Sequence, residues 1–251
     1  MSDLLLENYY NNRKDLSDFE KQISIPYEST KQFFDFINKK VKLDNTKNLI
    51  DACCGCGPAS FYVIKHFEIK QIYAFDITKN LLDIGKRVYS DLYRGDSGDR
   101  IIFKREDIFK LSNKALNFEA DGIICLQSLL MLNDWKSVLT SIAKTKTKWL
   151  AFSSLFYDGN IEAYMSIKSY NERNQIESEF PYNIYSKQIF SKYLKGLGYK
   201  DIHWNDFNIG MELIQKDINK VGTYTKKLVD GNYLQFSGPV HLPWSFLFAS
   251  R

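Results

Sequence analysis

The apolar positions of the chain fall into short runs that alternate with longer segments in which apolar residues recur at helical spacing. The short runs predict buried β-strands over 49–53, 71–76, 101–104, 121–126 and 149–154. The segments between them predict helices that end near residues 66, 93 and 143. Strands that alternate with helices indicate an α/β fold, in which a mostly parallel sheet is covered by helices on both faces.

The first 45 residues have a different, helical pattern. Apolar residues recur at helical spacing over 27–37, and Ser17 or Asp18 can cap an earlier helix. A threonine, Thr78, is the expected cap of the helix that follows the second strand. We therefore expect helices to precede the sheet in the chain.

The pattern changes again after Phe156. The sequence predicts a helix over 160–174, a loop over 177–185 and a helix over 186–197 that Gly198 ends. Further on it favours strands over 203–209, 223–228 and 234–250, with a hairpin turn at Asp230-Gly231. The Gly- and Asp-rich tract at 94–99 predicts another turn.

Composition and charge indicate which classes of partner the protein can bind. The chain has 251 residues, of which 44% are hydrophobic and 25% are charged, and its net charge of +4 comes without a dense basic block. This balance does not favour a nucleic-acid partner. The apolar runs are too short to span a membrane, and the acidic N-terminus lacks the long apolar run of a signal peptide. We expect a cytoplasmic protein.

The four cysteines form neither a disulfide framework nor a metal site. Cys53, Cys54 and Cys56 crowd into one turn, and Cys125 falls inside a predicted buried strand. A tetrahedral metal site would need a further Cys or His pair, which the sequence does not supply, so no metal is expected.

The turn after the first strand carries the strongest functional signal. Asp51 ends the apolar run, and Gly55 and Gly57 follow before a segment that can open a helix. Glycine lets a backbone approach a ligand closely, and the unpaired N–H groups of a helix start point at whatever lies there. Of two further carboxylates, Asp76 ends the second strand and Asp107 follows the third. Three acids after consecutive strands predict a nucleotide site at one sheet edge.

The run Leu49-Ile-Asp-Ala-Cys-Cys-Gly-Cys-Gly57 resembles motif I of the class I S-adenosylmethionine-dependent methyltransferases. That pattern is an acidic residue, one further residue and then Gly-x-Gly-x-Gly. Asp51, Gly55 and Gly57 match it, whereas Cys53 stands where the first glycine is usual. A dinucleotide-binding oxidoreductase is the main competitor, but its third glycine is missing here.

The resemblance implies a role for residues after each of the next strands. Asp76 resembles the ribose-binding acid, the segment at Asp107 resembles the one that contacts adenine, and residues 126–128 fall where motif IV contributes. It thus implies S-adenosyl-L-methionine as cofactor, S-adenosyl-L-homocysteine as product, and cofactor contacts from Asp51, Cys53, Cys54, Gly55, Gly57, Asp76, Ile77, Asp107, Ile108, Leu126 and Gln127.

The resemblance also implies a doubly wound sheet of seven strands with an antiparallel strand near the C-terminus. We expect one domain over 1–251. Its parts are a helical N-terminal lid (1–45), a cofactor-binding core (46–155), a substrate-side insertion (156–200) and C-terminal strands (201–251).

The acceptor and the catalytic base are open at this stage. Asp158, Tyr157 and His241 are the first candidates for catalysis, with Glu162 and His203 behind them, and each also has an ordinary structural role. The chain lacks the Asn/Asp-Pro-Pro-Tyr pattern of amino-directed enzymes after its fourth strand.

The favoured acceptor is therefore the hydroxyl or amine of a small polar molecule or sugar. An RNA or protein methyltransferase and a cofactor-binding protein without turnover are the alternatives, and the oligomeric state is undetermined.

Overall fold

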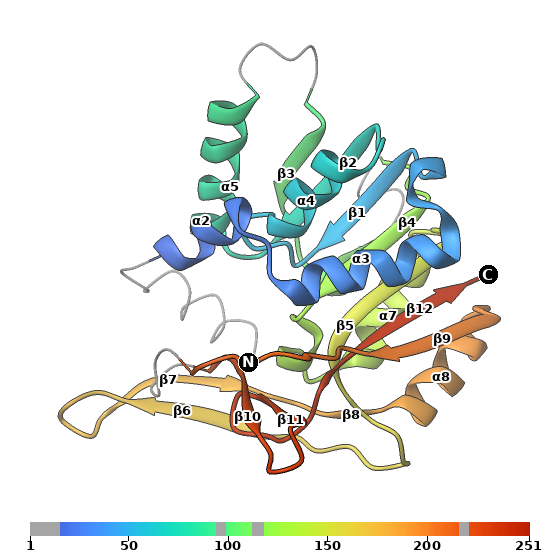
Figure 1. The fold of residues 1–251 in the computed structure, drawn as a ribbon. Coiled ribbons are helices and arrows are strands. Elements are labelled where there is room, and N and C mark those ends of the chain that lie inside the picture. The colour runs from blue at the N-terminus through green and yellow to red at the C-terminus, as the bar shows by residue number, and fades with distance from the viewer. Residues whose placement is uncertain (1–15, 94–98, 112–117, 216–220) are drawn as a thin grey trace.

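A computed structural model describes residues 16–93, 99–111, 118–215 and 221–251. Its centre is a twisted sheet with the strand order β3-β2-β1-β4-β5-β12-β9 (Figure 1). The strands are β1 (Asn48–Ala52), β2 (Gln71–Asp76), β3 (Ile101–Arg105), β4 (Gly122–Leu126), β5 (Trp149–Tyr157), β9 (Asp201–Asp206) and β12 (Trp244–Ser250). A short strand, β8 (Tyr185–Ser186), pairs with the end of β5.

The direction of the strands confirms the predicted fold class. Neighbouring strands from β3 to β5 are parallel, so their carboxyl ends meet at one edge of the sheet. Strand β12 is antiparallel to both of its neighbours, β5 and β9. The predicted antiparallel strand near the C-terminus is therefore β12.

Helices cover both faces of the sheet. On one face α3 (Glu28–Val41), α4 (Pro58–His66) and α5 (Lys79–Leu92) pack on the sheet through Phe33, Ile64 and Leu82. On the other face α7 (Trp135–Ala143) and α8 (Lys187–Gly196) pack through Leu139 and Phe190. The described residues also form the helix α2 (Ser17–Ser24) and the short 3₁₀ helices η1 (Leu43–Asn45), η2 (Ile108–Lys110) and η3 (Leu129–Met131).

Some helices begin at the N-cap residues that the sequence indicates, and others do not. Asp134 and Ser186 cap α7 and α8 by accepting hydrogen bonds from the N–H groups three residues further on. Thr78 occupies the N-cap position of α5, although its side chain makes no capping hydrogen bond in the described chain. The predicted caps of the first helix are wrong, because α2 begins after Leu16 and this residue holds the N-cap position.

The predicted helix over 160–174 and loop over 177–185 are wrong. The structure has instead a hairpin of β6 (Ser166–Tyr170) and β7 (Ile176–Pro181). Asn171 makes the turn between them, since its side chain accepts hydrogen bonds from the N–H groups of Arg173 and Gln175. Such local bonds offer the backbone an alternative to a helix.

The C-terminal part contains the predicted hairpin, formed by β10 (Thr223–Lys227) and β11 (Tyr233–Ser237) around Gly231. A single strand over 234–250 is wrong, because the chain turns at Gly238, where φ is +57°, and β12 starts only at Trp244. The strand predicted over 203–209 is β9, shifted toward the N-terminus. Most of the predicted turn at 94–99 lies outside the described residues.

Both hairpins lie beyond the carboxyl ends of the parallel strands, on the lower side of Figure 1. The edge at which ligands of such sheets bind therefore has additional chain built around it. Among the described residues, no helix combines the length and the apolar character needed to cross a membrane.

Candidate functional site: the carboxyl edge of the sheet

The turn after β1 has an unusual backbone. Three of its residues are in the left-handed region, with φ of +54° at Cys53, +57° at Gly55 and +84° at Gly57. Residues other than glycine rarely adopt such angles. The residue that departs from the glycine pattern therefore has the backbone conformation that glycine favours, so the shape of the turn is kept.

Close packing fixes this turn against the rest of the domain. A Cβ atom added at Gly57 would lie 2.8 Å from the Phe103 ring. One added at Gly85, in the middle of α5, would lie 2.7 Å from the carbonyl oxygen of Cys56. The backbone of the turn thus touches β3 and α5 directly, where a side chain would not fit.

Asp51 lies beneath the turn. Its side chain is only 2% exposed and accepts a hydrogen bond of 2.6 Å from the Ser60 hydroxyl in α4. Burial raises the pKa of Asp51 to about 7, against the lowering effect of the Ser60 bond. This contact ties the end of β1 to the helix that follows the turn.

Asp76 joins the turn to the end of β2. One of its carboxylate oxygens accepts a hydrogen bond of 2.9 Å from the Gly55 N–H, and the other accepts one of 2.8 Å from the Thr78 N–H. Burial raises the pKa of this carboxyl group. This carboxylate also accepts hydrogen bonds from the Thr78 side chain and the Ile77 backbone. Its place at the end of β2, beside the turn after β1, fits the ribose of a nucleotide.

The residues after β3 lie beside the same edge. Asp107 caps η2 by accepting a hydrogen bond from the Phe109 N–H, and Lys110 lies 3.2 Å from its other oxygen. Ile108 is buried, whereas Ile77 is half-buried beyond the end of β2. These side chains offer a carboxylate next to apolar surface, which fits the amino group and ring of adenine.

The turn after β4 is bonded to the turn after β1. The Ser128 hydroxyl donates to the carbonyl oxygen of Cys53 at 3.3 Å. Gln127, directly after Leu126, has a φ of +56°, and its N–H donates to the Ser153 carbonyl in β5. The predicted cofactor residues of both turns thus lie in one bonded unit.

The N-terminal helices reach this unit through contacts that the sequence pattern does not reveal. The Gln127 side-chain amide donates to the Ser29 hydroxyl in α3 at 3.3 Å. The Cys56 thiol donates to the Phe19 carbonyl oxygen in α2 at 3.2 Å. An ion pair of 2.6 Å between Glu20 and Arg87 links α2 to α5.

The cysteines of the turn are held as thiols. Burial raises the pKa of Cys54 well above its ordinary value and that of Cys56 to about 12. For Cys53, a hydrogen bond with Cys125 and burial raise the pKa. A thiol is a poor nucleophile compared with a thiolate, so these side chains are packing groups.

Two of the three catalytic candidates lie together. Tyr157 and His241 both line a groove of about 180 Å³ beyond the end of β5. Its other walls are apolar side chains from three segments: Ile161, Ala163, Ile184, Val240 and Leu242. The groove residues other than Tyr157 and His241 carry no motif and were missed in the sequence.

The remaining candidates make contacts of their own. Asp158 forms an ion pair with Lys187 at 2.8 Å and is not part of the groove lining. Glu162 accepts a hydrogen bond from Tyr164. His203, on strand β9, lies 3.3 Å from Asp201.

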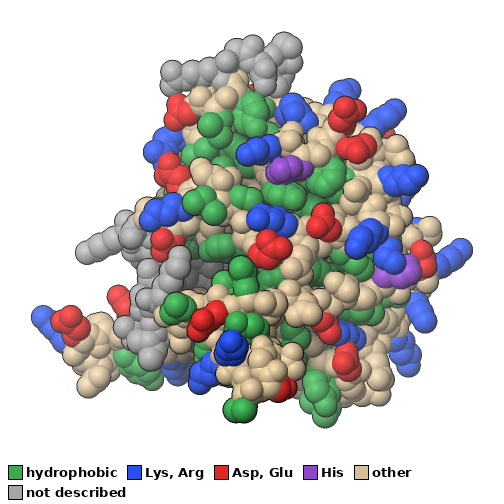
Figure 2. Space-filling model, viewed as in Figure 1, with side chains coloured by type: hydrophobic (Ala, Val, Ile, Leu, Met, Phe, Trp, Pro, Cys, Tyr) green, Lys and Arg blue, Asp and Glu red, His purple; other side chains and the backbone are tan. Residues whose placement is uncertain are grey.

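Charged side chains are dispersed on the face seen in Figure 2, where basic and acidic groups alternate. This face has no basic patch among its described residues, in line with the modest net charge of +4. A long electrostatic track for a phosphate backbone would need clustered Lys and Arg residues.

The strand order, the antiparallel β12 and the glycine turn after β1 together define the class I, Rossmann-like methyltransferase fold. Solved structures share it. Magnesium protoporphyrin IX methyltransferase (ChlM) from Synechocystis PCC 6803 with bound SAM is 13% identical, with a TM-score of 0.59 over 100% of this chain and 97% of that one. An S-adenosylmethionine-dependent methyltransferase from Clostridium acetobutylicum ATCC 824 is 15% identical, with a TM-score of 0.57 over 93% and 96%.

One solved structure with the same fold has a different activity in its name. The [4+2]-cyclase SpnF is 19% identical, with a TM-score of 0.51, and the match covers 70% of this chain but only 59% of that one. No protein-family model matches the chain, and a search of curated proteins found no match. The comparisons therefore establish the fold, and the activity has to be argued from the site.

Proposed function

We propose that this protein is an S-adenosylmethionine-dependent methyltransferase that transfers a methyl group to the hydroxyl or amine of a small molecule. The observation that carries the proposal is the position of Asp76. Its carboxylate is bonded to the Gly55 N–H of the turn after β1 and lies at the end of β2, at the edge of the sheet where ligands bind.

The cofactor contacts follow from this position. Asp76 would bind the ribose hydroxyls, and Asp107 would accept a hydrogen bond from adenine between Ile77 and Ile108. The methionine part would lie over the turn from Cys53 to Gly57, near Leu126 and Gln127. Asp51 would hold this turn in place through Ser60.

The bound cofactor would supply an activated methyl group on a sulfonium. The contribution of the protein is then to hold the acceptor atom in line with the bond that breaks and to keep water away. Such positioning can provide on the order of 7–11 kcal/mol of the barrier reduction. The sequence favours a small polar molecule or sugar as the acceptor of the methyl group, and this acceptor stays a prediction.

The replacement Asp76→Ala tests the proposal. We expect it to weaken the binding of S-adenosyl-L-homocysteine by about 1.5–3 kcal/mol, because hydrogen bonds to a charged acceptor are lost. Calorimetric titration measures the affinity directly. Asp83→Ala, on the exposed side of α5, is the matched control. Binding of Asp76→Ala as tight as that of wild type would contradict the ribose assignment.

A second function deserves a direct comparison because SpnF, named a cyclase, has the same fold. The second function is that of a cofactor-binding protein without turnover, which would bind the cofactor without consuming it. Incubation with methyl-labelled cofactor and a metabolite extract distinguishes the two functions. Label in a product supports methyl transfer, whereas cofactor binding without any labelled product over the whole extract supports the second function.

A further inference from the structure

The groove that contains Tyr157 and His241 opens at the same edge of the sheet as the cofactor turn. Tyr157 is the last residue of β5, which is parallel to β4, and β4 is parallel to β1. Another part of the lining, residues 240–242, lies shortly before Trp244, which pairs with Leu155 near the end of β5. An acceptor in this groove would therefore lie on the ligand-binding side of the sheet.

The size and lining of the groove restrict what it can hold. Its volume is about 180 Å³. An apolar cavity of about 150 Å³ holds one benzene molecule, so the groove suits a single six-membered ring. Its walls are mostly aliphatic, and Ile161 is 63% exposed in the absence of a ligand. Such walls offer few hydrogen-bond partners, so they favour a flat apolar ring over a sugar, whose hydroxyls need such partners.

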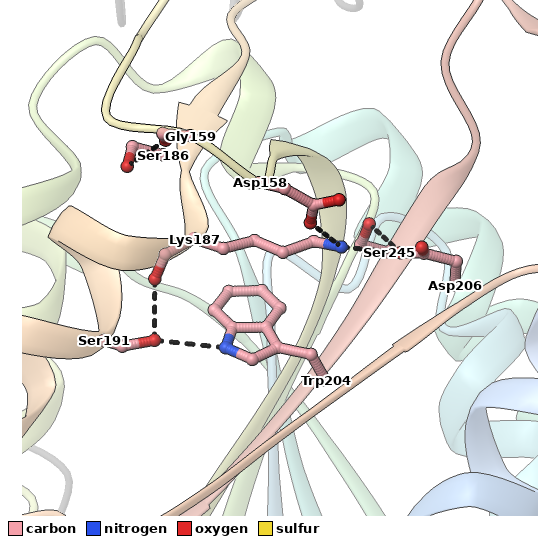
Figure 3. Close-up of polar contacts among 8 residues, drawn as sticks. All are labelled: Asp158, Gly159, Ser186, Lys187, Ser191, Trp204, Asp206 and Ser245. Atoms are coloured by element: carbon pink, nitrogen blue, oxygen red, sulfur yellow. Dashed lines mark hydrogen bonds and ion pairs between the residues drawn. The ribbon is translucent and has the colours of Figure 1, made fainter.

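The walls are held in place by polar contacts behind them. Figure 3 shows Lys187 extended across the Trp204 ring, with its amine between Asp158 and Asp206. The lysine side chain is 13% exposed, and its amine lies 2.8 Å from Asp158 and 2.9 Å from Asp206. Because Asp158 follows Tyr157 in the chain, this ion pair links the end of the wall that carries the tyrosine to α8.

Two further bonds join the walls. The Ser186 hydroxyl donates to the Gly159 carbonyl at 2.7 Å, and the Ala163 N–H donates to the Ile184 carbonyl at 2.9 Å. The segment from Tyr157 to Ala163 is thus bonded to the residue before α8 and to Ile184, which directly precedes β8. A preformed pocket of this kind binds a rigid ligand with little loss of conformational freedom.

Two lining side chains can exchange a proton, the Tyr157 hydroxyl and the His241 imidazole. Among hydroxyl acceptors, a phenol loses its proton most readily, with a pKa of about 10 for the tyrosine side chain. A neutral imidazole can therefore activate a phenol with a modest energetic penalty, whereas an aliphatic hydroxyl holds its proton far more strongly.

We propose that the acceptor is a phenol, that is, a neutral aromatic ring bearing the hydroxyl to be methylated, and that the ring lies between Ile161 and Leu242. This inference rests on the proposed methyltransferase function and gives its substrate class. His241 takes the proton of the phenol, and the phenol oxygen forms the new bond to the methyl carbon. The electron pair of the broken bond stays on sulfur, and the proton leaves His241 for water.

The first experiment compares acceptors by two readouts. Wild-type protein with S-adenosyl-L-homocysteine is titrated with 4-methylphenol and with methyl glucoside, and methyl transfer to each is then measured with S-adenosyl-L-methionine. We expect 4-methylphenol to bind and to be methylated at least about tenfold more efficiently, the range for a matched apolar contact.

Exposed positions allow variants that fold. Ile161→Asn places an amide in the groove wall and is expected to raise the KM for 4-methylphenol about tenfold. Ile176→Asn, an exposed isoleucine on β7 outside the groove, is the matched control. His241→Gln is expected to lower kcat about a hundredfold with little change in phenol binding, and His203→Gln is its control.

The outcomes separate this inference from the proposed function. Tight binding of S-adenosyl-L-homocysteine combined with methylation of methyl glucoside but not of 4-methylphenol would overturn the phenol assignment alone. Unchanged phenol binding and KM in Ile161→Asn would overturn the assignment of the groove. Failure of wild-type protein to bind S-adenosyl-L-homocysteine would instead overturn the proposed function.

Discussion

Asp51 shows how a single buried group can make stability depend on pH. Burial raises its pKa to about 7 in the folded protein, whereas an aspartate in an unfolded chain has a pKa of about 3.9. Between these values the folded state keeps a proton that the unfolded chain has released. The contribution of Asp51 to stability is therefore complete below about pH 4 and falls as the pH rises toward 7.

The variant Asp51→Asn removes this dependence, because an amide does not titrate but still offers Ser60 an acceptor oxygen. We expect the variant to gain about 2–4 kcal/mol of unfolding free energy relative to wild type between pH 4 and pH 8. Denaturant unfolding at a series of pH values measures the difference. A difference that stays constant with pH would mean that the carboxyl group is ionised as readily in the folded protein as in the unfolded one.

Backbone strain is concentrated at the same edge. Cys53 and Gln127 both have left-handed backbones, which cost a residue with a side chain roughly 1–2 kcal/mol. Strained residues of this kind are found where the surrounding structure over-determines them and where function needs a fixed shape. Here the two residues follow β1 and β4, and the Ser128 hydroxyl bonds to the first of them.

At the scale of elements, the contact between α5 and the turn after β1 limits which residue can stand at position 85. Alanine stabilises a helix interior by about 1 kcal/mol relative to glycine. At Gly85, however, the added methyl group would lie 2.7 Å from both the Cys56 carbonyl oxygen and the Phe103 ring. We expect Gly85→Ala to destabilise the protein by about 1–3 kcal/mol despite the propensity gain.

The matched control is Gly196→Ala at the end of α8, where nothing lies within 4 Å of the added atom. This change is expected to leave the stability the same or to raise it slightly. Thermal unfolding of both variants tests the pair. Equal melting temperatures for the two would show that α5 can move away from the turn without cost.

The elements that the sequence predicted well are those whose signal is local. The strands β1, β2 and β4 are continuous apolar runs because both faces of a parallel sheet are buried. The hairpin at Gly231 was also predictable, since Asp-Gly specifies a tight turn. The hairpin of β6 and β7 was missed because its exposed face mixes polar and apolar residues, which hides the two-residue period.

The site residues likewise fall into those that a local sequence signal indicated and those that it did not. The positions of Asp76 and Asp107 were predictable because one ends a strand and the other follows the next strand, and parallel strands bring their ends together. Ile184, Lys187 and Val240 were not, since their roles depend on contacts between segments far apart in the chain. The sequence suggests Asp158 as a candidate base, whereas its pairing with Lys187 follows only from the structure.

At the scale of the molecule, Lys187 connects the end of β5 with the outer strands. Its amine pairs with Asp158 and Asp206, and Asp206 also accepts a hydrogen bond from Ser245 in β12. We expect Lys187→Met to lower the unfolding free energy by about 1–2 kcal/mol, less than for a fully buried pair because both carboxylates are substantially exposed. Lys192→Met, exposed on the same helix, is the control.

Denaturant unfolding measures both lysine variants. The effect of Lys187→Met should shrink when Asp158 and Asp206 are neutralised as well, since the repulsion left between the two carboxylates is then removed. A loss of the same size in that triple variant would assign the effect to the packing of the lysine stem on Trp204.

The position of β12 has a consequence for how the protein is made. This strand is translated last among the elements of the sheet, yet it lies between β5 and β9 and supplies the pairing of both. While the ribosome is still adding residues 244–250, the growing chain leaves an apolar gap in its sheet. Nascent chains arrested before Trp244 should therefore recruit chaperones more strongly than chains in which β12 has left the ribosome.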